Sequence, residues 1–237
     1  MSFLNDASLV LLISHVLGDF QFQSQELSDI KTKSLKAVGK HLLIHGLVLI
    51  LIPIIAFGWG GFSTLFPLIL TIWLSHGILD IAKFYLNRVD GINKEKLYVA
   101  DQLLHVFFII LFSTFVFDLH VILSFNNRDI LEWLLLLLVV TKPANVTFKT
   151  VFQRFQFQSG TQTVPGAGAI IGNLERILSA IFLSMNQIAA IGFIYTAKSI
   201  ARFKEIEDNK RFAEYYLIGT LFSILYVVVA YFVIIVM

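Results

Sequence analysis

Six runs of mostly apolar residues, each about twenty residues long, constrain this chain more than any other feature. An α-helix needs about that length to cross roughly 30 Å of hydrocarbon. Apolar side chains make up 57% of the 237 residues and charged ones only 14%, which is too few to cover a soluble domain of this size. The sequence therefore predicts an all-α polytopic transmembrane helical bundle, with spans at 7–23, 38–57, 62–86, 98–117, 177–197 and 213–236.

A seventh apolar run, at 130–141, ends after about a dozen residues at Lys142-Pro143. That length is short for a crossing and is typical of a re-entrant or interfacial half-helix. No repeat or long linker divides the chain. We therefore expect a single transmembrane domain over 1–237, with helices 1–4 at 7–117, an irregular or interfacial connection at 118–170 and C-terminal helices at 171–237.

Composition also excludes several classes of protein. The chain has no cysteine, so that disulfides, thiolate metal sites and cysteine nucleophiles are ruled out. A net charge of +2 is too small to indicate nucleic acid as a partner. No lysine or arginine precedes the first apolar run, so that run is expected to remain as a span and not to act as a cleaved signal peptide.

Lysine and arginine gather in three of the polar connections. Because positively charged short loops stay on the cytoplasmic side, the connections at 24–40, 83–97 and 198–211 are expected in the cytoplasm. The N-terminus and the turn at 58–63 have no basic residue and are expected outside, as is the C-terminus. This orientation requires that 130–141 does not cross, and it leaves Arg128, Lys142, Lys149 and Arg154 on the outer side.

Ionisable side chains recur inside the first four spans, always as a pair four residues apart. The pairs are His15 with Asp19, His41 with His45, His76 with Asp80, and Asp101 with His105. Four residues turn an α-helix through about 400°, so that the two members of a pair share one face, about 6 Å apart along the axis. In the expected orientation all four pairs fall in the cytoplasmic half of the membrane. We therefore expect them to converge inside a bundle.

Three aspartates facing lipid would be unfavourable, because a carboxylate at mid-membrane costs about 2.5–3.5 kcal/mol. They must face one another, water or a metal. Neutral imidazoles and carboxylates are ligands of Zn²⁺, Mn²⁺ and Fe²⁺, and eight such groups suffice for one or two ions with positions left for water. The pattern favours an intramembrane metal centre; a structural His/Asp network and a proton relay are the alternatives.

With these residues in view, the chain resembles DUF3307, a family of uncharacterised bacterial membrane proteins. The resemblance rests on His15-Val-Leu-Gly-Asp-Phe-Gln-Phe-Gln23, on His41 and His45, on His76-Gly-Ile-Leu-Asp80 with Lys83, and on Asp101-Gln-Leu-Leu-His105. It extends to Gly172-Asn-Leu-Glu-Arg176, Ala190-Ile-Gly-Phe193, Lys198-Ser-Ile-Ala-Arg-Phe203 and Glu214-Tyr-Tyr-Leu-Ile-Gly-Thr220. The resemblance implies a bacterial integral membrane protein with the same polar set, hence one of the inner membrane. It implies no reaction.

A metal-dependent hydrolase is the function that we expect from this pattern. Its ion would activate water for attack on a membrane-associated, lipid or lipid-linked substrate near the cytoplasmic leaflet, with Asp19 or Asp101 as general base. Gln23 and Lys83 lie where they would bind that substrate. A transporter or channel for divalent metal or protons is one alternative, and a non-catalytic membrane partner with a structural His/Asp cluster is another.

Glu175, Arg176 and His120 are three ionisable residues outside the four pairs for which the sequence gives a specific expectation. Glu175 and Arg176 precede the fifth expected span and are expected as an interfacial charge pair at a helix start, or else as groups that close an outer vestibule. His120, the sixth histidine, is expected in solvent in an outer loop. None of the three is expected to join the metal centre.

Overall fold

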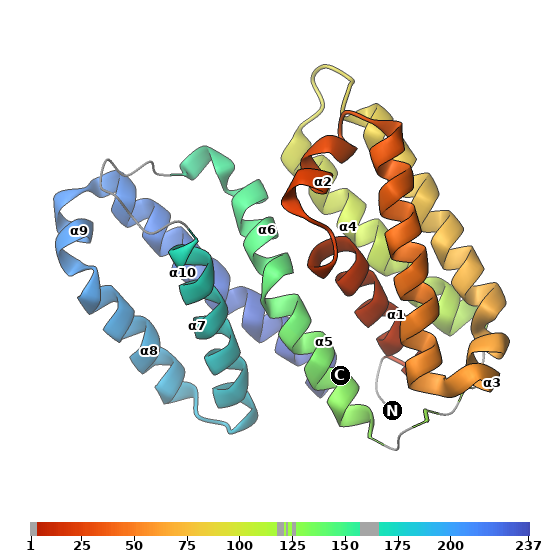
Figure 1. Cartoon of the computed structure of the whole chain (residues 1–237). Coiled ribbons are helices and arrows are strands. Elements are labelled where there is room, and N and C mark those ends of the chain that lie inside the picture. The colour runs from red at the N-terminus through yellow and green to blue at the C-terminus, as the bar shows by residue number, and fades with distance from the viewer. Residues whose placement is uncertain (1–3, 118–120, 122, 125–126, 157–165) are drawn as a thin grey trace. The chain divides into compact units, whose positions relative to one another are not determined.

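The computed structural model describes residues 4–117, 121, 123–124, 127–156 and 166–237. All regular structure in these ranges is helical, which confirms the all-α prediction (Figure 1). The elements are α1 Asp6–Val16, η1 Leu17–Gln21, α2 Gln25–Lys31, α3 Leu35–Leu86, α4 Lys94–Ile110, η2 Leu111–Val116, α5 Arg128–Val140, α6 Lys142–Val151, η3 Gln153–Phe155, α7 Ala167–Ser184, α8 Ile188–Ala201, α9 Phe203–Asp208, α10 Lys210–Tyr231 and η4 Phe232–Val236. His120 lies outside the described residues.

Five helices of the described ranges are long and apolar enough to cross a membrane, so that the chain is a membrane protein. They cover Leu35–Leu86, Lys94–Val116, Arg128–Val151, Ala167–Ser184 and Lys210–Val236. The helix α8 is apolar but shorter. The ends at Val116 and Val236 agree closely with the predicted spans 98–117 and 213–236.

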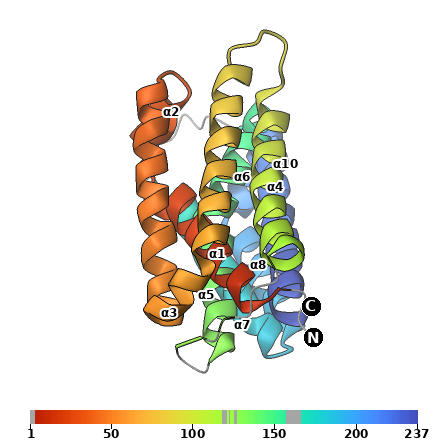
Figure 2. The ribbon, with the colours of Figure 1, turned by 90° about the vertical axis from the view of Figure 1, so that its right-hand side faces the viewer.

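The helix α3 has 52 residues, and a straight helix of that length would measure about 78 Å, far more than a bilayer. It breaks at Gly58, where φ is 67° and ψ is −178°. Such a backbone favours glycine because a Cβ would be strained there. The chain turns back at this break (Figure 2), which gives two arms, 35–57 and 59–86. These arms match the predicted spans 38–57 and 62–86.

The chain divides into two compact units, Met1–Leu138 and Val139–Val236, called here the N-terminal and the C-terminal unit. The single domain expected from the sequence stays a prediction. In the N-terminal unit, α1 packs against α3 and α4, and its Leu9, Val10 and Leu11 have no exposed surface. Because α1 is enclosed in this way, its His15 and the following Asp19 project into the interior and not into lipid.

The C-terminal unit packs α7 against α8 and α10, and α6 against α7 and α10. The helices α7 and α8 are antiparallel (Figure 1), joined by a short turn in which Asn186 has a φ of 55°. Asparagine tolerates this left-handed conformation better than most residues. The predicted span 177–197 is therefore wrong. The sequence is apolar on both sides of the turn, so that hydropathy alone did not reveal it.

The half-helix predicted at 130–141 corresponds to α5, which ends at Val140, and its position relative to the membrane stays a prediction. The helices α5 and α6 follow each other almost without interruption, and Arg128–Val151 is long enough to cross. Pro143 lies in the first turn of α6, where its missing N–H would have no helical partner in any case. The proline therefore starts a new helix segment, and much of the connection expected at 118–170 is helical.

Candidate metal centre

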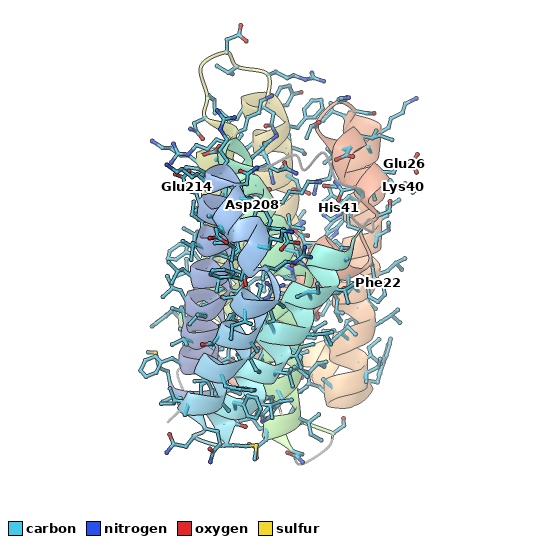
Figure 3. All side chains as sticks on the ribbon, turned by 90° about the vertical axis from the view of Figure 1, so that its left-hand side faces the viewer. Phe22, Glu26, Lys40, His41, Asp208 and Glu214 are labelled. Atoms are coloured by element: carbon cyan, nitrogen blue, oxygen red, sulfur yellow. The ribbon has the colours of Figure 1, made fainter. Side chains whose placement is uncertain are left out.

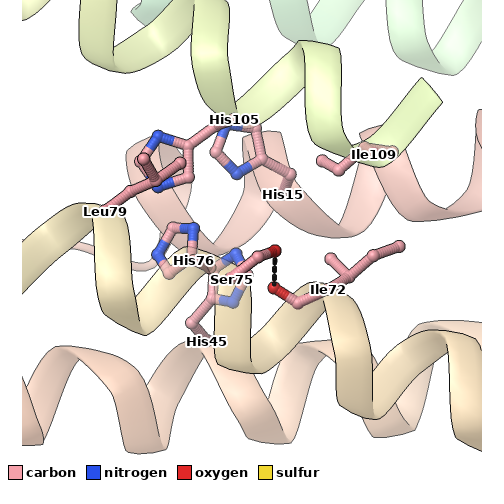
Figure 4. A pocket seen from close by; sticks show the side chains of 8 residues that line it. All are labelled: His15, His45, Ile72, Ser75, His76, Leu79, His105 and Ile109. Carbon is pink, nitrogen blue, oxygen red and sulfur yellow. Dashed lines mark hydrogen bonds between the residues drawn. The ribbon is translucent and has the colours of Figure 1, made fainter. Parts of the chain in front are cut away.

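The eight side chains of the four predicted pairs come together inside the N-terminal unit. They come from four separate segments: α1 with η1, the two arms of α3, and α4. Seven of these residues are buried, and the side chain of the eighth, Asp19, is 6% exposed. Figure 4 shows imidazoles of three helices, α1, α3 and α4, facing one small cavity. The convergence expected from the spacing is therefore present.

Asp19 reaches the centre from a π-helical turn. In η1 the Phe22 N–H donates to the carbonyl of Leu17 at 2.8 Å, one residue further back than in an α-helix, and such turns are frequent at functional sites. Gly18, beside Asp19, touches the neighbouring arm so closely that an added Cβ would lie 2.6 Å from Cδ2 of His45. A side chain at position 18 would therefore force His45 or the backbone of η1 to shift.

Four imidazole nitrogens surround Oδ1 of Asp19. The Nε2 atoms of His41, His76 and His45 lie 3.2, 3.4 and 3.8 Å from it, and Nδ1 of His15 lies at 4.0 Å. In the described residues, no ion pair between Asp19 and a lysine or arginine is found. One buried carboxylate is thus ringed by groups that are neutral unless protonated.

His41 and His76 form the shared edge of two triangles of possible ligand atoms. Their Nε2 atoms are 3.2 Å apart and share a hydrogen bond. Asp19 Oδ1 completes one triangle, and Asp80 Oδ2 completes the other at 3.4 Å from His41 and 3.6 Å from His76. Ligands bound tetrahedrally at 2.0–2.2 Å are roughly 3.3–3.6 Å apart. Both triangles therefore have the dimensions of a face of a tetrahedral metal site.

Asp101 and His105 extend the centre along α4. Nδ1 of His105 lies 2.8 Å from the carbonyl oxygen of Asp101 and must donate to it, because a carbonyl only accepts. The lone pair of the neutral ring is then on Nε2, as in metal-binding histidines whose other ring nitrogen donates to a carbonyl. His105 lines the same cavity as His15, His45 and His76, so that its Nε2 belongs to the centre.

The potential ligands form more than one group that is close enough to bind an ion. The ligand atoms within each of three sets lie within 4.8 Å of one another. The sets are His15, Asp19, His45 and His76; His41, His76 and Asp80; and Asp80, Asp101 and His105. The first and the third share no residue, which is compatible with one ion or with two.

Two lysines balance two of the three carboxylates. Lys83, predicted as a substrate-binding residue, donates from Nζ to Oδ2 of Asp101 at 2.6 Å. Lys31 of α2 donates to Oδ2 of Asp80 at 3.1 Å and to Oε1 of Gln23 at 3.4 Å. Sequence reasoning missed Lys31 at this site because α2 lies outside the spans and its fold over the centre follows no helical spacing. The roles of Gln23 and Lys83 stay predictions.

Eight buried polar atoms of the centre have no hydrogen-bond partner. They are both ring nitrogens of His15 and of His45, Nδ1 of His41, Nε2 of His105, and Oδ1 of Asp19 and of Asp101. Within the described part of the chain, every such buried side-chain atom belongs to this centre. An unsatisfied buried polar group costs about 1–3 kcal/mol, so that these atoms fit a bound cation with neutral imidazole and carboxylate ligands.

The cavity among these groups is small. It encloses about 10 Å³ and is lined by His15, His45, Ile72, Ser75, His76, Leu79, His105 and Ile109. That volume is about what one water molecule needs. The centre thus has room for an ion or a water, and an organic substrate would have to approach from its edge.

Comparison with known proteins places the four pairs in one family. The sequence profile described as "Protein of unknown function (DUF3307)" matches residues 8–132. No curated protein and no solved structure shows significant similarity to the chain. The match contains all eight residues of the centre and ends within α5, so that the resemblance of the C-terminal motifs stays a prediction. Because it covers more than half of the 237 residues, the chain belongs to the DUF3307 family.

Proposed function

We propose that the N-terminal unit binds one or two divalent transition metal ions inside the membrane and uses them to hydrolyse a membrane-associated substrate. The observation that carries the metal proposal is the set of eight buried polar atoms without a partner. A network that served only to join helices would satisfy its own groups, because unpaired buried groups destabilise the fold. The centre instead leaves eight buried atoms without a hydrogen-bond partner.

The donor set favours Zn²⁺, Mn²⁺ or Fe²⁺. Five imidazoles and three carboxylates suit these ions, whereas Ca²⁺ and Mg²⁺ prefer a shell of oxygen. The triangles that His41 and His76 form with Asp19 and with Asp80 have ligand spacings of 3.2–3.6 Å. These spacings support a site that binds the ion with little rearrangement.

Hydrolysis is the reaction that such a centre supports best. A divalent ion in a site with an open position supplies a water of lowered pKa and polarises the bond to be cleaved. Asp19 and Asp101 each keep an Oδ1 without a hydrogen bond, and either carboxylate can accept the proton of the attacking water. Because a tetrahedral ion needs only four ligands, some of the eight groups can act as a proton acceptor in place of a ligand.

Transport of metal ions or protons is less well supported. Toward the beginning of α1, beyond the centre, Leu9 and Leu11 are fully buried and Leu12 is 7% exposed. An ion moving along α1 would leave the imidazoles for apolar side chains, which do not replace its ligands. We propose that the ion is resident, and that the protein acts in the inner membrane of a bacterium with the centre nearer the cytoplasmic leaflet.

Metal analysis of the purified protein tests the first half of this proposal. The protein should carry about one to two equivalents of Zn, Mn or Fe, measured by mass spectrometry of the elements. His76 belongs to two of the three ligand sets, so that His76→Leu should lose most of the metal. His120→Leu is the matched control and should keep it. Protein that stays metal-free after incubation with Zn²⁺, Mn²⁺ or Fe²⁺ would contradict the proposal.

Hydrolysis needs a separate measurement. Chromogenic phosphate and carboxylate esters in mixed detergent micelles serve as probes, with the metal-loaded wild type, Asp19→Asn and Asp101→Asn compared at equal metal content. We expect turnover by the wild type and a loss of at least about 100-fold in the variant whose carboxylate is the general base. A metal-loaded protein without turnover on any probe would leave a metal centre and remove the hydrolase.

A further inference from the structure

The two lysines of the centre lie at the boundary between its buried acids and its surroundings. The side chain of Lys31 is 13% exposed and that of Lys83 is 22% exposed, while their partners Asp80 and Asp101 are 1% and 3% exposed. Lys31 comes from α2, and Lys83 from the end of the second arm of α3. Each ammonium group therefore lies between a buried carboxylate of the centre and the more exposed edge of the centre, called here the rim.

The ammonium groups and a metal would compete for the same carboxylates. Oδ2 of Asp80 is 3.1 Å from Nζ of Lys31 and 3.4 Å from Nε2 of His41, so that one oxygen faces both the lysine and a potential metal ligand. Asp80 and Asp101 also form a ligand set with His105. Metal bound to these carboxylates would weaken both lysine pairs and free ammonium groups at the rim.

Metal binding would also reverse the charge of the centre. With neutral imidazoles, three carboxylates and two ammonium groups leave one negative charge. One divalent ion makes the sum +1, and two make it +3. Excess positive charge in a buried site is unfavourable unless an anion balances it.

We infer that the substrate of this centre presents a phosphate group, which Lys31 and Lys83 bind together with the metal. The inference rests on the proposed metal-dependent function and names its substrate class. A phosphate carries up to two charges and directs its oxygens to several sides, which suits two ammonium groups on different elements and an ion between them. A carboxylate has two oxygens in one plane and fits this arrangement less well, and a neutral ester or amide leaves the charge unbalanced.

The phosphate has two sources, a lipid headgroup or a soluble phosphate compound. Phe22 lies one residue before Gln23, the residue that Lys31 contacts, and it is 57% exposed. Its side chain lies at the edge of the unit, away from the interior position of His41 (Figure 3). An exposed aromatic ring next to the residue that Lys31 contacts would pack on acyl chains near a headgroup. A lipid phosphate at the rim would need no large cavity.

Two binding measurements on the metal-loaded protein test this inference. One titrates inorganic phosphate by calorimetry, and the other titrates nanodiscs of phosphatidylcholine with and without phosphatidic acid. Lys31→Ala and Lys83→Ala should each weaken phosphate binding about 10-fold or more, the effect of losing one charged hydrogen bond. Lys36 is exposed, so that Lys36→Ala is the matched control and should change the affinity by less than about twofold.

The same variants should affect metal binding in the opposite direction. Without its ammonium group, Asp80 is free for the ion, so that Lys31→Ala should bind metal at least as tightly as the wild type while it binds phosphate less well. A merely structural lysine would weaken both. Lys31→Met and Lys83→Met keep the apolar stem without the charge and replace the alanine variants if those fail to fold.

Each outcome decides the inference. Binding of phosphate, of phosphatidic acid or of both supports it, and the more responsive arm identifies the source. A metal-loaded wild type that binds neither, or lysine variants that bind phosphate like the wild type, would overturn it and leave the metal centre intact. A protein that binds no metal overturns the inference together with the proposed function.

Discussion

Each unit contains a buried polar cluster, and the two clusters differ in how fully their groups are satisfied. In the C-terminal unit, Arg176 is 3% exposed. It donates to the carbonyl of Val140, to Asn145 at 2.6 Å, to Asn173 at 2.9 Å and to Ser223 at 3.2 Å. In the N-terminal unit, six of the eight residues of the centre carry a polar atom without a partner. One cluster satisfies its polar groups as the chain folds, and the other leaves eight buried polar atoms without a hydrogen-bond partner.

The Arg176 cluster has a structural explanation. Thr141, between α5 and α6, has φ −97° and ψ −104°, so that the helix is interrupted and the carbonyl of Val140 accepts from the arginine instead of from a helical N–H. Beside it, Lys198 of α8 pairs with Glu175 of α7 at 2.8 Å and lies over the Tyr216 ring at 5.2 Å. Buried charged groups whose hydrogen bonds are satisfied in this way hold helices together. The contrast supports a ligand-binding role for the incomplete cluster alone.

The largest effect on stability is expected from Arg176→Ala. The substitution leaves the Val140 carbonyl and the amide oxygen of Asn145 without their donor, and each unsatisfied buried acceptor costs about 1–3 kcal/mol. The melting temperature in detergent should fall strongly, with no change in the metal content of protein that remains folded. Arg202→Ala is the control, because its pair with Glu205 is exposed and should contribute little. A melting temperature unchanged by Arg176→Ala would remove the structural explanation of this cluster.

The opposite behaviour is expected at His45, both of whose ring nitrogens lack a partner. Leucine keeps most of the volume and removes two unsatisfied groups, so that metal-free His45→Leu should be as stable as metal-free wild type or more stable. Metal affinity should fall at least about 100-fold, because even changes beyond the direct ligands cost 10–100-fold.

Thermal melting with and without a chelator separates the two effects. A chelator should lower the melting temperature of the wild type, since bound metal stabilises the folded state by mass action, and should leave His45→Leu unchanged. If metal-free His45→Leu melts well below metal-free wild type, the imidazole is satisfied in the fold, and the difference between the two clusters disappears.

Periodicity predicted the centre well because its residues obey one rule. The four pairs at i, i+4 lie on helix faces that must turn away from lipid, so that convergence followed from spacing and burial. Lys31 obeys no such rule, because α2 packs over the centre through tertiary contacts that the spacing of the sequence does not contain. The π-helical turn at Leu17–Gln21 was likewise invisible, since one added residue per turn leaves no mark in composition.

The C-terminal unit was predicted less well for the same reason. Hydropathy measures the length of an apolar run but not where the chain reverses inside it, and the reversal at Met185–Gln187 needs only three residues. The expectation for Glu175 and Arg176 was also wrong. They lie in the middle of α7, buried, and do not open a span. A helix that begins at Ala167 places them about two turns from its start.

The corrected helices also change the orientation expected for the loops beside the Arg176 cluster. If Arg128–Val151 crosses once, α7 crosses back and α8 crosses again, then the basic residues after α6 and those after α8 lie on the same side of the membrane. The positive-inside rule makes that side cytoplasmic. Arg154, expected outside from the sequence, then lies in the cytoplasm, and the turn at Met185 lies outside.

Single cysteines at positions 154 and 185 test this orientation, because the chain contains no cysteine of its own. Both positions are exposed, so that the substitutions should have almost no effect on stability. Met185→Cys should react with a membrane-impermeant maleimide in intact cells. Arg154→Cys should react only in inverted membrane vesicles, and each variant is the control for the other. Labelling of both from the same side would mean that α7 does not separate them across the membrane. The basic residues after α6 and after α8 would then no longer set the orientation of α7 and α8 in the membrane.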